Sequence, residues 1–275
     1  MGSEFLQHGV VSGYRYRVVR LPMWRYDAVG KLVFMTTGSL TVLFESNAQR
    51  LNVMQKNNVS STCVRPKKKK SIEDIDSYDT IIYIHGKGGS AMESEHYKLL
   101  FPNCDVIGLD YQTFTPWETG QEIRIAVKEL KRRFGNIILI ANSIGAFFSM
   151  NAGIEGIIQK AYFISPIVDM EKLITDMMKW ANVTEQDLES KGVIHTNFGE
   201  DLSWEYLSYV RRHPIGWRVP TQILYGSTDH LMSIDTITDF ANKHQATLTV
   251  MEGGEHWFHT EKQMQFLDNW IKEIN

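Results

Sequence analysis

Cysteine is scarce in this sequence, and so are the residue patterns that bind metal ions. The 275 residues include two cysteines, Cys63 and Cys104. Two are too few for the disulfide framework of a small secreted protein, and their spacing is not that of a metal site. The nine histidines are scattered, with no H-E-x-x-H motif and no cluster of carboxylates. We therefore expect no metal ion and no other cofactor.

The sequence also lacks a long apolar run and a strong charge of either sign. No run approaches the length of a membrane-spanning helix, so we expect no stable insertion into a membrane. The net charge of −3 argues against a nucleic acid as partner. The basic run from Lys67 to Lys70 is accordingly expected to be a solvated loop. Because no secretory signal is visible, the sequence predicts a cytoplasmic protein, although removal of a leader would leave no trace.

Patterns typical of strands and helices alternate from about Asp79 onward. A chain of 275 residues that is 43% hydrophobic can bury one large core. Alternation of this kind predicts an α/β fold with a mostly parallel central sheet flanked by helices, here as a single domain over 1–275. The expected order is strand 80–84, helix near 91–100, strand 105–110, helix 119–134, strand 136–141, helix 145–156 and strand 160–165.

A serine between small residues follows the strand predicted at 136–141. The pentapeptide Ala141-Asn142-Ser143-Ile144-Gly145 differs from G-x-S-x-G only in its alanine. A strand that turns sharply into a helix needs small residues two positions before and after the serine, because the two elements come close together there. The alternative is a serine that merely caps the following helix.

An acid and a histidine also lie on turns that follow predicted strands. Asp229 comes after the run 222–226, and His256 comes after the run 248–251 and two glycines. A serine hydroxyl needs an imidazole to take its proton, and the imidazole needs a carboxylate to orient it and compensate its charge. Asp110 and Asp169 are competing acids, and we favour Asp229.

The chain order of Ser143, Asp229 and His256 is nucleophile, acid and base, and here the sequence resembles the α/β-hydrolase superfamily. Within it, the resemblance is to small carboxylesterases and lipases with a helical cap. The interval of 27 residues between acid and base is similar to the usual spacing of that superfamily. The resemblance implies the α/β-hydrolase fold and a catalytic triad formed by these three residues.

The continuous apolar run Thr80 to Ile84 ends in a glycine-rich turn, His85-Gly86-Lys87-Gly88-Gly89. The resemblance implies that the backbone N–H groups of Lys87 and Ile144 form an oxyanion hole. Glycine suits this turn because the backbone itself must approach the substrate. A phosphate-binding loop is the alternative reading, but its G-x-x-x-x-G-K-[ST] spacing is absent.

A segment of about 167–218 is longer than a simple connection between two strands requires. It is similar to the helical cap of the superfamily, inserted after the sixth strand, and we expect two or three short helices in it. Most of its apolar side chains are expected to pack against the core, and some to face the substrate. The candidates for substrate binding, from the cap and elsewhere, are Gly86, Gly88, Trp117, Met177 and Trp257.

The first part of the chain is longer than the hairpin that usually leads this fold. Gly2-Ser3-Glu4-Phe5 is similar to a cloning-site remnant. Residues 1–78 are expected to contain a leader and the first strands. Tyr14 to Val19 alternates as a strand does, and Lys31 to Phe44 is expected to form a hairpin through Thr37-Gly38-Ser39. The sequence leaves the oligomeric state open.

These features together predict a serine esterase. It would hydrolyse small-molecule carboxylic esters, with short to medium acyl or small aromatic groups, through an acyl-enzyme intermediate. The sequence does not distinguish this esterase from a lipase, a feruloyl-type esterase, a thioesterase or a peptidase of the same fold. A non-catalytic protein that binds a small molecule is a further alternative, but it has no need of Ser143, Asp229 and His256 together. A dehalogenase or an epoxide hydrolase would need aspartate in place of Ser143.

Overall fold

The computed structural model divides the chain into two compact units, Met1–Lys68 and Lys69–Asn275. It describes residues 80–274 throughout, and before them the backbone of five strands. β1 (Gln7–Val11), β2 (Tyr14–Arg20) and β5 (Leu40–Phe44) form an antiparallel sheet in the order β1-β2-β5, and β3 (Met23–Tyr26) pairs with β4 (Leu32–Met35).

The strand predicted at 14–19 is confirmed by β2, but the hairpin predicted from Lys31 to Phe44 is wrong. The two strands of that region do not pair with each other, since β4 pairs with β3 and β5 pairs with β2. Alternation along a sequence marks a segment as a strand without fixing its partner.

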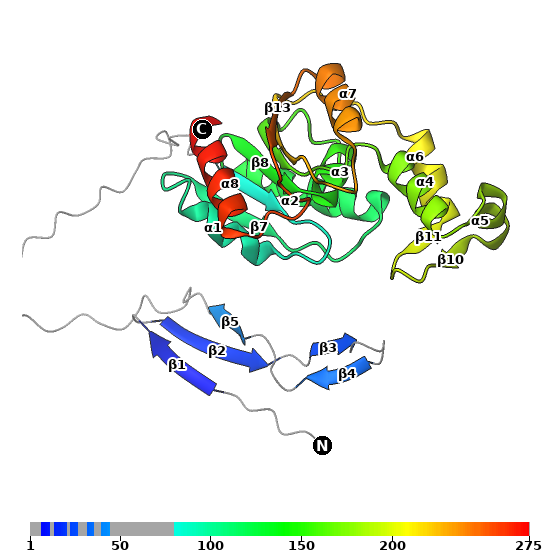
Figure 1. Cartoon of the computed structure of the whole chain (residues 1–275). Coiled ribbons are helices and arrows are strands. Elements are labelled where there is room, and N and C mark those ends of the chain that lie inside the picture. The colour runs from blue at the N-terminus through cyan, green and yellow to red at the C-terminus, as the bar shows by residue number, and fades with distance from the viewer. Residues whose placement is uncertain are drawn as a thin grey trace, which may run out of the picture. The chain divides into compact units, whose positions relative to one another are not determined.

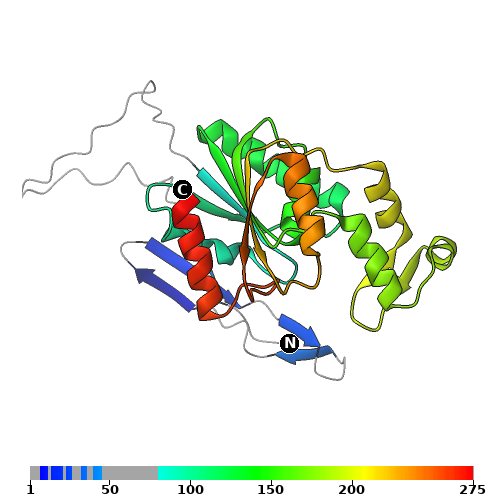
Figure 2. The same cartoon turned by 45° about the horizontal axis from the view of Figure 1, so that its top comes forward.

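The second unit is built on a six-stranded sheet with the order β13-β12-β9-β8-β6-β7. Every neighbouring pair in this sheet is parallel. The predicted parallel sheet is therefore confirmed (Figure 2). Its strands are β6 (Thr80–Ile84), β7 (Asp105–Leu109), β8 (Ile137–Asn142), β9 (Ile158–Ile164), β12 (Thr221–Gly226) and β13 (Thr247–Met251).

Helices cover both faces of this sheet (Figure 1). α2 (Pro116–Arg133), α3 (Ile144–Asn151) and α7 (Ile234–His244) contribute to one apolar cluster, while α1 (Ser94–Lys98) and α8 (Glu261–Ile274) contribute to the other. A short 3-10 helix, Ala91–Glu93, leads into α1.

Alternate side chains of β6 show how the two clusters are divided. Ile82 and Ile84 belong to the cluster of α2, α3 and α7, whereas Ile81 and Tyr83 belong to that of α1 and α8. Each of the four is at most 1% exposed. This explains why β6 is a continuous apolar run, because a strand covered on both faces has no solvent side.

The segment between β9 and β12 corresponds to the region expected to be a cap, although it follows the fourth strand of the parallel sheet in chain order and not the sixth. It contains α4 (Met170–Trp180), α5 (Glu185–Lys191) and α6 (Trp204–Arg212), which confirms the short helices. Between α5 and α6 lies a hairpin that was not predicted, β10 (Val193–His195) paired with β11 (Asp201–Ser203) (Figure 1). Strands of three residues are too short to give a recognisable alternation.

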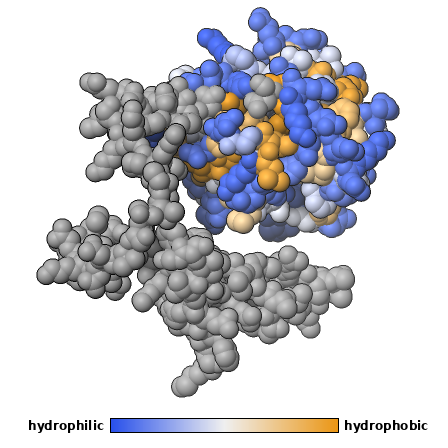
Figure 3. Space-filling view, turned by 90° about the vertical axis from the view of Figure 1, so that its left-hand side faces the viewer, coloured by the Kyte–Doolittle hydropathy of each residue, from blue (hydrophilic) through white to orange (hydrophobic). Residues whose placement is uncertain are grey.

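Some large apolar side chains of the second unit remain exposed. Leu99 and Met92 are 85% and 71% exposed, and Ile125 is 61% exposed. Figure 3 shows hydrophobic side chains gathered among hydrophilic ones on the face turned toward the viewer. None of the helices among the described residues combines the length and apolar character needed to cross a bilayer.

Candidate active site

Ser143 occupies a strained turn between β8 and α3. Its φ of 52° and ψ of −121° lie in a region that residues with a side chain rarely adopt. The turn is fixed by a hydrogen bond of 3.0 Å from its backbone N–H to the carbonyl oxygen of Ile164. A Cβ atom at Gly145 would lie only 2.4 Å from the carbonyl oxygen of His85. Glycine at 145 therefore allows α3 to begin against the end of β6.

The structure brings Ser143, His256 and Asp229 together in the predicted order. Ser143 Oγ lies 2.8 Å from His256 Nε2, and His256 Nδ1 lies 2.6 Å from Asp229 Oδ2. Asp229 follows β12, and His256 follows β13. The three side chains therefore meet at the carboxyl ends of parallel strands, where sites in sheets of this kind are found.

The Asp229 carboxylate is buried but fully hydrogen-bonded. Its side chain has no exposed area, and Oδ1 accepts a hydrogen bond of 2.8 Å from the backbone N–H of Leu231. The competing acids lie elsewhere: Asp169 accepts a bond from the N–H of Lys172 as the cap of α4, and Asp110 is exposed. Among the described carboxylates, Asp229 is the one bonded to His256.

The turns that carry Asp229 and His256 are held against each other by backbone contacts. A Cβ atom at Gly226 would lie 2.4 Å from the carbonyl oxygen of Gly254. That same oxygen accepts hydrogen bonds from the N–H and the hydroxyl of Thr228, at 2.9 and 2.7 Å. The distance between Asp229 and His256 is therefore set by the backbone of the two turns.

The glycine-rich turn after β6 lies beside Ser143, and a Cβ atom at Gly86 would be 3.1 Å from the Cβ of Ser143. In residues 80–274, neither the N–H of Lys87 nor that of Ile144 has a hydrogen-bond acceptor. Both backbone donors are thus unpaired within this part of the chain. The turn is held from behind by Tyr111, whose hydroxyl donates to the carbonyl oxygen of His85 at 2.9 Å.

The side chain of Lys87 links this turn to the cap. Its ammonium forms an ion pair with Glu200, which lies in the turn of the β10–β11 hairpin. The two side chains are 55% and 38% exposed. Sequence reasoning missed this contact because no spacing rule connects residues so far apart in the chain.

Two cavities open at Ser143, and we name them the apolar cavity and the turn cavity. The apolar cavity has a volume of about 340 Å³ and lies between Ser143 and the cap. The turn cavity has a volume of about 330 Å³ and is lined by the glycine-rich turn and His256. The apolar cavity is lined chiefly by Phe114, Ile144, Leu173, Ile174, Met177 and Phe198.

Four of the five predicted substrate-binding residues line these cavities. Met177 lines the apolar cavity, while Gly86, Gly88 and Trp257 line the turn cavity. Trp117 does not line either of them. Its ring packs 5.1 Å from that of Tyr209 and lines a separate depression. The helix α2 begins at Pro116, so Trp117 is held on the first turn of that helix instead of on a loop over the site.

Two polar residues of the turn cavity were not predicted, Glu93 and Asn142. Glu93 ends the short 3-10 helix and Asn142 precedes Ser143. A single glutamate in a short helix gives no pattern in a sequence. Asn142 stands at a variable position of the turn motif, so its neighbours do not mark it either.

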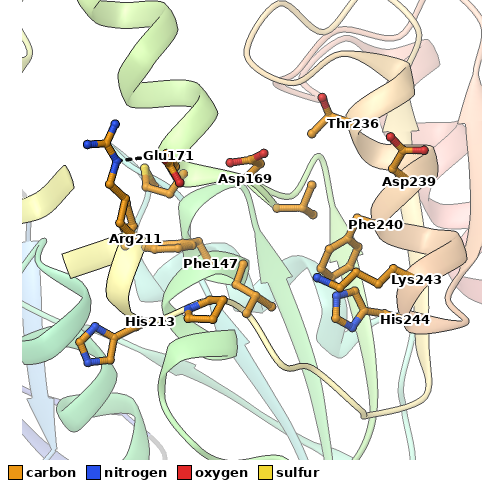
Figure 4. Close-up of a pocket in the computed structure, with 15 residues that line it drawn as sticks. Phe147, Asp169, Glu171, Arg211, His213, Thr236, Asp239, Phe240, Lys243 and His244 are labelled. Atoms are coloured by element: carbon orange, nitrogen blue, oxygen red, sulfur yellow. Dashed lines mark hydrogen bonds and ion pairs between the residues drawn. The ribbon is translucent and has the colours of Figure 1, made fainter. Parts of the chain in front are cut away.

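A further cavity of about 380 Å³ lies away from Ser143 (Figure 4). Its walls carry charges of both signs, and Asp169, Arg211 and Lys243 are examples. Arg211 is already paired with Glu171 there. The cavity contains none of Ser143, Asp229 and His256. Within residues 80–274, no group of three or more metal-binding side chains comes together.

Comparison with known proteins identifies solved structures of the same architecture. Est1E from Butyrivibrio proteoclasticus is 16% identical with a TM-score of 0.59, over 74% of this chain and 88% of its own. Alpha/beta hydrolase domain-containing protein 10 from mouse is 14% identical with a TM-score of 0.55, over 98% of both chains. A lipase-esterase related protein from Clostridium acetobutylicum is 15% identical with a TM-score of 0.51, over 74% and 96%.

No protein-family profile matches the chain, and no curated protein matches it in sequence. Its likeness to known proteins therefore lies in structure, and identities of 14–16% establish architecture alone. The parallel sheet, the serine turn after β8 and the cap after β9 agree with that likeness. The chain has the α/β-hydrolase fold, as the resemblance of its sequence predicted.

Proposed function

We propose that the protein is a serine hydrolase that cleaves carboxylic esters through an acyl-enzyme intermediate. One observation carries the proposal: Ser143 Oγ, the His256 imidazole and the buried Asp229 carboxylate form a continuous hydrogen-bonded series with distances of 2.8 and 2.6 Å. A serine within reach of an imidazole that is itself oriented by a buried acid is the arrangement that activates a hydroxyl nucleophile.

In the first half of the reaction, Ser143 Oγ bonds to the ester carbonyl carbon while His256 Nε2 takes the hydroxyl proton. The carbonyl oxygen becomes negative and is stabilised by the N–H groups of Lys87 and Ile144. The bond to the alcohol oxygen then breaks, and that oxygen takes the proton from His256. The acyl group remains on Ser143, and Asp229 compensates the charge of the imidazolium while it lasts.

In the second half, a water molecule takes the place of the alcohol. It gives a proton to His256 as its oxygen bonds to the acyl carbon, and the bond to Ser143 Oγ breaks. Ser143 recovers its proton from His256, and the carboxylic acid leaves. No other reactant is needed, because each proton that His256 accepts is returned within the same half-reaction.

The apolar cavity supports an apolar acyl group. Its volume of about 340 Å³ and its lining by Met177, Phe114 and Phe198 suit a short to medium chain or a small aromatic acid. Est1E has been solved with ferulic acid bound, so aromatic esters belong in a test panel. Lipase, feruloyl-type esterase, thioesterase and peptidase activities are variants of the same chemistry.

A fluorophosphonate probe tests the proposal because it reacts with an activated serine and not with an ordinary one. We expect a single adduct on Ser143 by mass spectrometry, and its loss in Ser143→Ala. Ser190→Ala is the matched control, since Ser190 is an exposed serine of the cap whose hydroxyl binds the carbonyl oxygen of Asp187. Hydrolysis of p-nitrophenyl esters of rising chain length would then define the acyl preference.

The alternative of a non-catalytic binding protein gives the opposite result. A folded protein that leaves Ser143 unlabelled and hydrolyses none of the esters is not a serine hydrolase. Ester hydrolysis that persists in Ser143→Ala would place the nucleophile on another residue.

A further inference from the structure

The two cavities that meet at Ser143 differ in the chemistry of their walls. The apolar cavity is lined mainly by aliphatic and aromatic side chains of the cap and of α3. The turn cavity is lined by the backbone of the glycine-rich turn and by Glu93, Asn142, His256 and Trp257. A substrate that fills both must therefore have two ends of different polarity.

His256 determines which end of an ester occupies which cavity. In the proposed reaction its Nε2 atom must give a proton to the oxygen of the leaving alcohol, so that oxygen lies beside the imidazole. His256 lines the turn cavity and is not part of the wall of the apolar cavity. The alcohol therefore occupies the turn cavity, and the acyl group extends into the apolar cavity.

We infer that the substrate is an ester of an apolar acid with a non-anionic alcohol that carries further hydroxyl groups, and that Glu93 selects this alcohol. This inference rests on the proposed function. It assigns Glu93 as a specificity-determining residue that takes no part in the proton transfers. Hydroxyl groups are the neutral ligands that suit a carboxylate, because they donate hydrogen bonds to its oxygens.

Glu93 is held in place by two hydrogen bonds. Its Oε2 accepts from the hydroxyl of Tyr83 at 2.5 Å, and its Oε1 accepts from the backbone N–H of Ser90 at 3.2 Å. Burial raises the pKa of Tyr83 well above its usual range, so the phenol keeps the proton that it donates. Each carboxylate oxygen retains a second lone pair, and these are the acceptors that the turn cavity offers.

The charges around the turn cavity disfavour an anionic alcohol. Glu93 contributes a negative charge and Lys87 a positive one that is already paired with Glu200. Because the charge of Lys87 is already balanced by Glu200, the uncompensated charge at the cavity is that of Glu93, which repels an anionic alcohol. The exposed ring of Trp257, stacked on His259 with ring centres 4.6 Å apart, adds an apolar wall against which the carbon skeleton of the alcohol can lie.

The test compares alcohols while the acyl group is held constant. Ethyl, glyceryl, glucosyl and choline butyrates are hydrolysed by the full-length protein, and release of acid is followed by titration at constant pH. We expect the glyceryl or the glucosyl ester to exceed the ethyl and choline esters by at least about tenfold in kcat/KM, the effect of one or two hydrogen bonds. Whichever of the two is preferred distinguishes a glycerol ester from a sugar ester.

Glu93→Gln tests the role of the carboxylate. It keeps an acceptor for the Tyr83 hydroxyl but presents an amide donor in place of the second acceptor. We expect the ratio of kcat/KM between the preferred hydroxylated ester and the ethyl ester to fall to about threefold or less. Both values of kcat/KM in this ratio are measured on the same variant, so a general loss of activity lowers them equally and leaves the ratio unchanged. Glu95→Gln is the matched control, because Glu95 lies two residues away and pairs with Lys98 outside both cavities.

The outcomes separate this inference from the proposed function. Ester hydrolysis with a labelled Ser143 but no preference for the hydroxylated alcohols would overturn the inference alone, as would a preference for the choline ester. A ratio that is unchanged in Glu93→Gln would remove Glu93 from the selection. An unlabelled Ser143 without hydrolysis of any ester would overturn both.

Discussion

Replacing Gly145 by alanine tests the geometry of the serine turn directly. The added Cβ atom would lie 2.4 Å from the carbonyl oxygen of His85 and 2.7 Å from that of Ile84. Both neighbours are backbone atoms at the end of a central strand, so neither can rotate away. To restore a separation of 3.0 Å, which is already very close, α3 and the end of β6 must move apart by 0.6 Å, from 2.4 Å.

The cost of this movement can be set against the gain from alanine in a helix. Overpacking of a tight contact costs about 1–3 kcal/mol. Alanine is favoured over glycine within a helix by up to about 1 kcal/mol, which offsets part of that cost. Because the contact is with two carbonyl groups of the sheet, we expect Gly145→Ala to lower the free energy of unfolding by about 1–2 kcal/mol.

Catalytic activity is expected to fall as well. The carbonyl groups that must move precede Gly86 and Lys87, so the N–H of Lys87 shifts relative to Ser143. A misplacement of catalytic groups by about 1 Å can cost about a hundredfold in rate. For the smaller shift expected here, we predict a loss of about tenfold or more in kcat for ester hydrolysis.

Urea unfolding followed by tryptophan fluorescence measures the stability, and hydrolysis of a p-nitrophenyl ester measures the activity. Gly156→Ala is the matched control, because a Cβ atom there would meet nothing within 4 Å. It is expected to leave kcat unchanged and to stabilise slightly, by about 0.4–1 kcal/mol. If Gly145→Ala matched the wild type in both stability and turnover, the close approach described for this turn would be incorrect.

Three further predictions concern the carboxylates of Asp229, Glu200 and Asp176. Asp229→Asn should keep the protein folded by circular dichroism but lower kcat by about 10⁴-fold, the effect of losing the orienting carboxylate of a triad; near-normal turnover would assign another acid. Glu200→Gln breaks the half-exposed ion pair with Lys87 and should lower the free energy of unfolding in urea by less than about 1 kcal/mol. A larger loss would contradict the description of this ion pair as exposed to solvent. Lysine hydrogen bonds within α4, that of Lys172 foremost, hold the pKa of Asp176 below its usual range. The free energy of unfolding in urea should therefore be higher for the wild type than for Asp176→Asn at neutral pH, and this difference should vanish in strong acid. A difference that grows on acidification would refute this reasoning.

The architecture of the second unit could be predicted because each sheet strand has a strong local signal. β6 is apolar throughout because it is covered on both faces, and α2 shows its buried stripe in Ile123, Val127 and Leu130. Boundaries were less accurate. α2 begins at Pro116, three residues before the predicted start, because proline suits the first position of a helix and Thr115 caps it.

The triad geometry was predictable for a different reason, since its residues lie on turns whose backbone requirements leave a trace in the sequence. Gly145 and the glycine pair before His256 are such traces. The contacts proposed to select the substrate leave no such trace in the sequence. The β10–β11 hairpin, the Lys87–Glu200 ion pair and the place of Glu93 depend on contacts between segments far apart in the chain. Such contacts follow from packing, which no local pattern records.

From the close approaches at Gly145 and Gly226 we expect the proposed chemistry and the proposed selectivity of this site to depend on different residues. Each approach joins two turns at the ends of neighbouring parallel strands, so the backbone at these strand ends positions the turn of Ser143 and the turns of Asp229 and His256. The cap segment contributes the wall of the apolar cavity, one exposed ion pair and the backbone N–H of Ile167, which donates to the carbonyl oxygen of Ser143 at 3.1 Å. Substitutions of cap residues such as Met177 should therefore change KM and the preferred acyl group while the rate of Ser143 labelling by a small fluorophosphonate stays the same. A cap variant that abolished labelling while remaining folded would show that the cap, too, positions the catalytic residues.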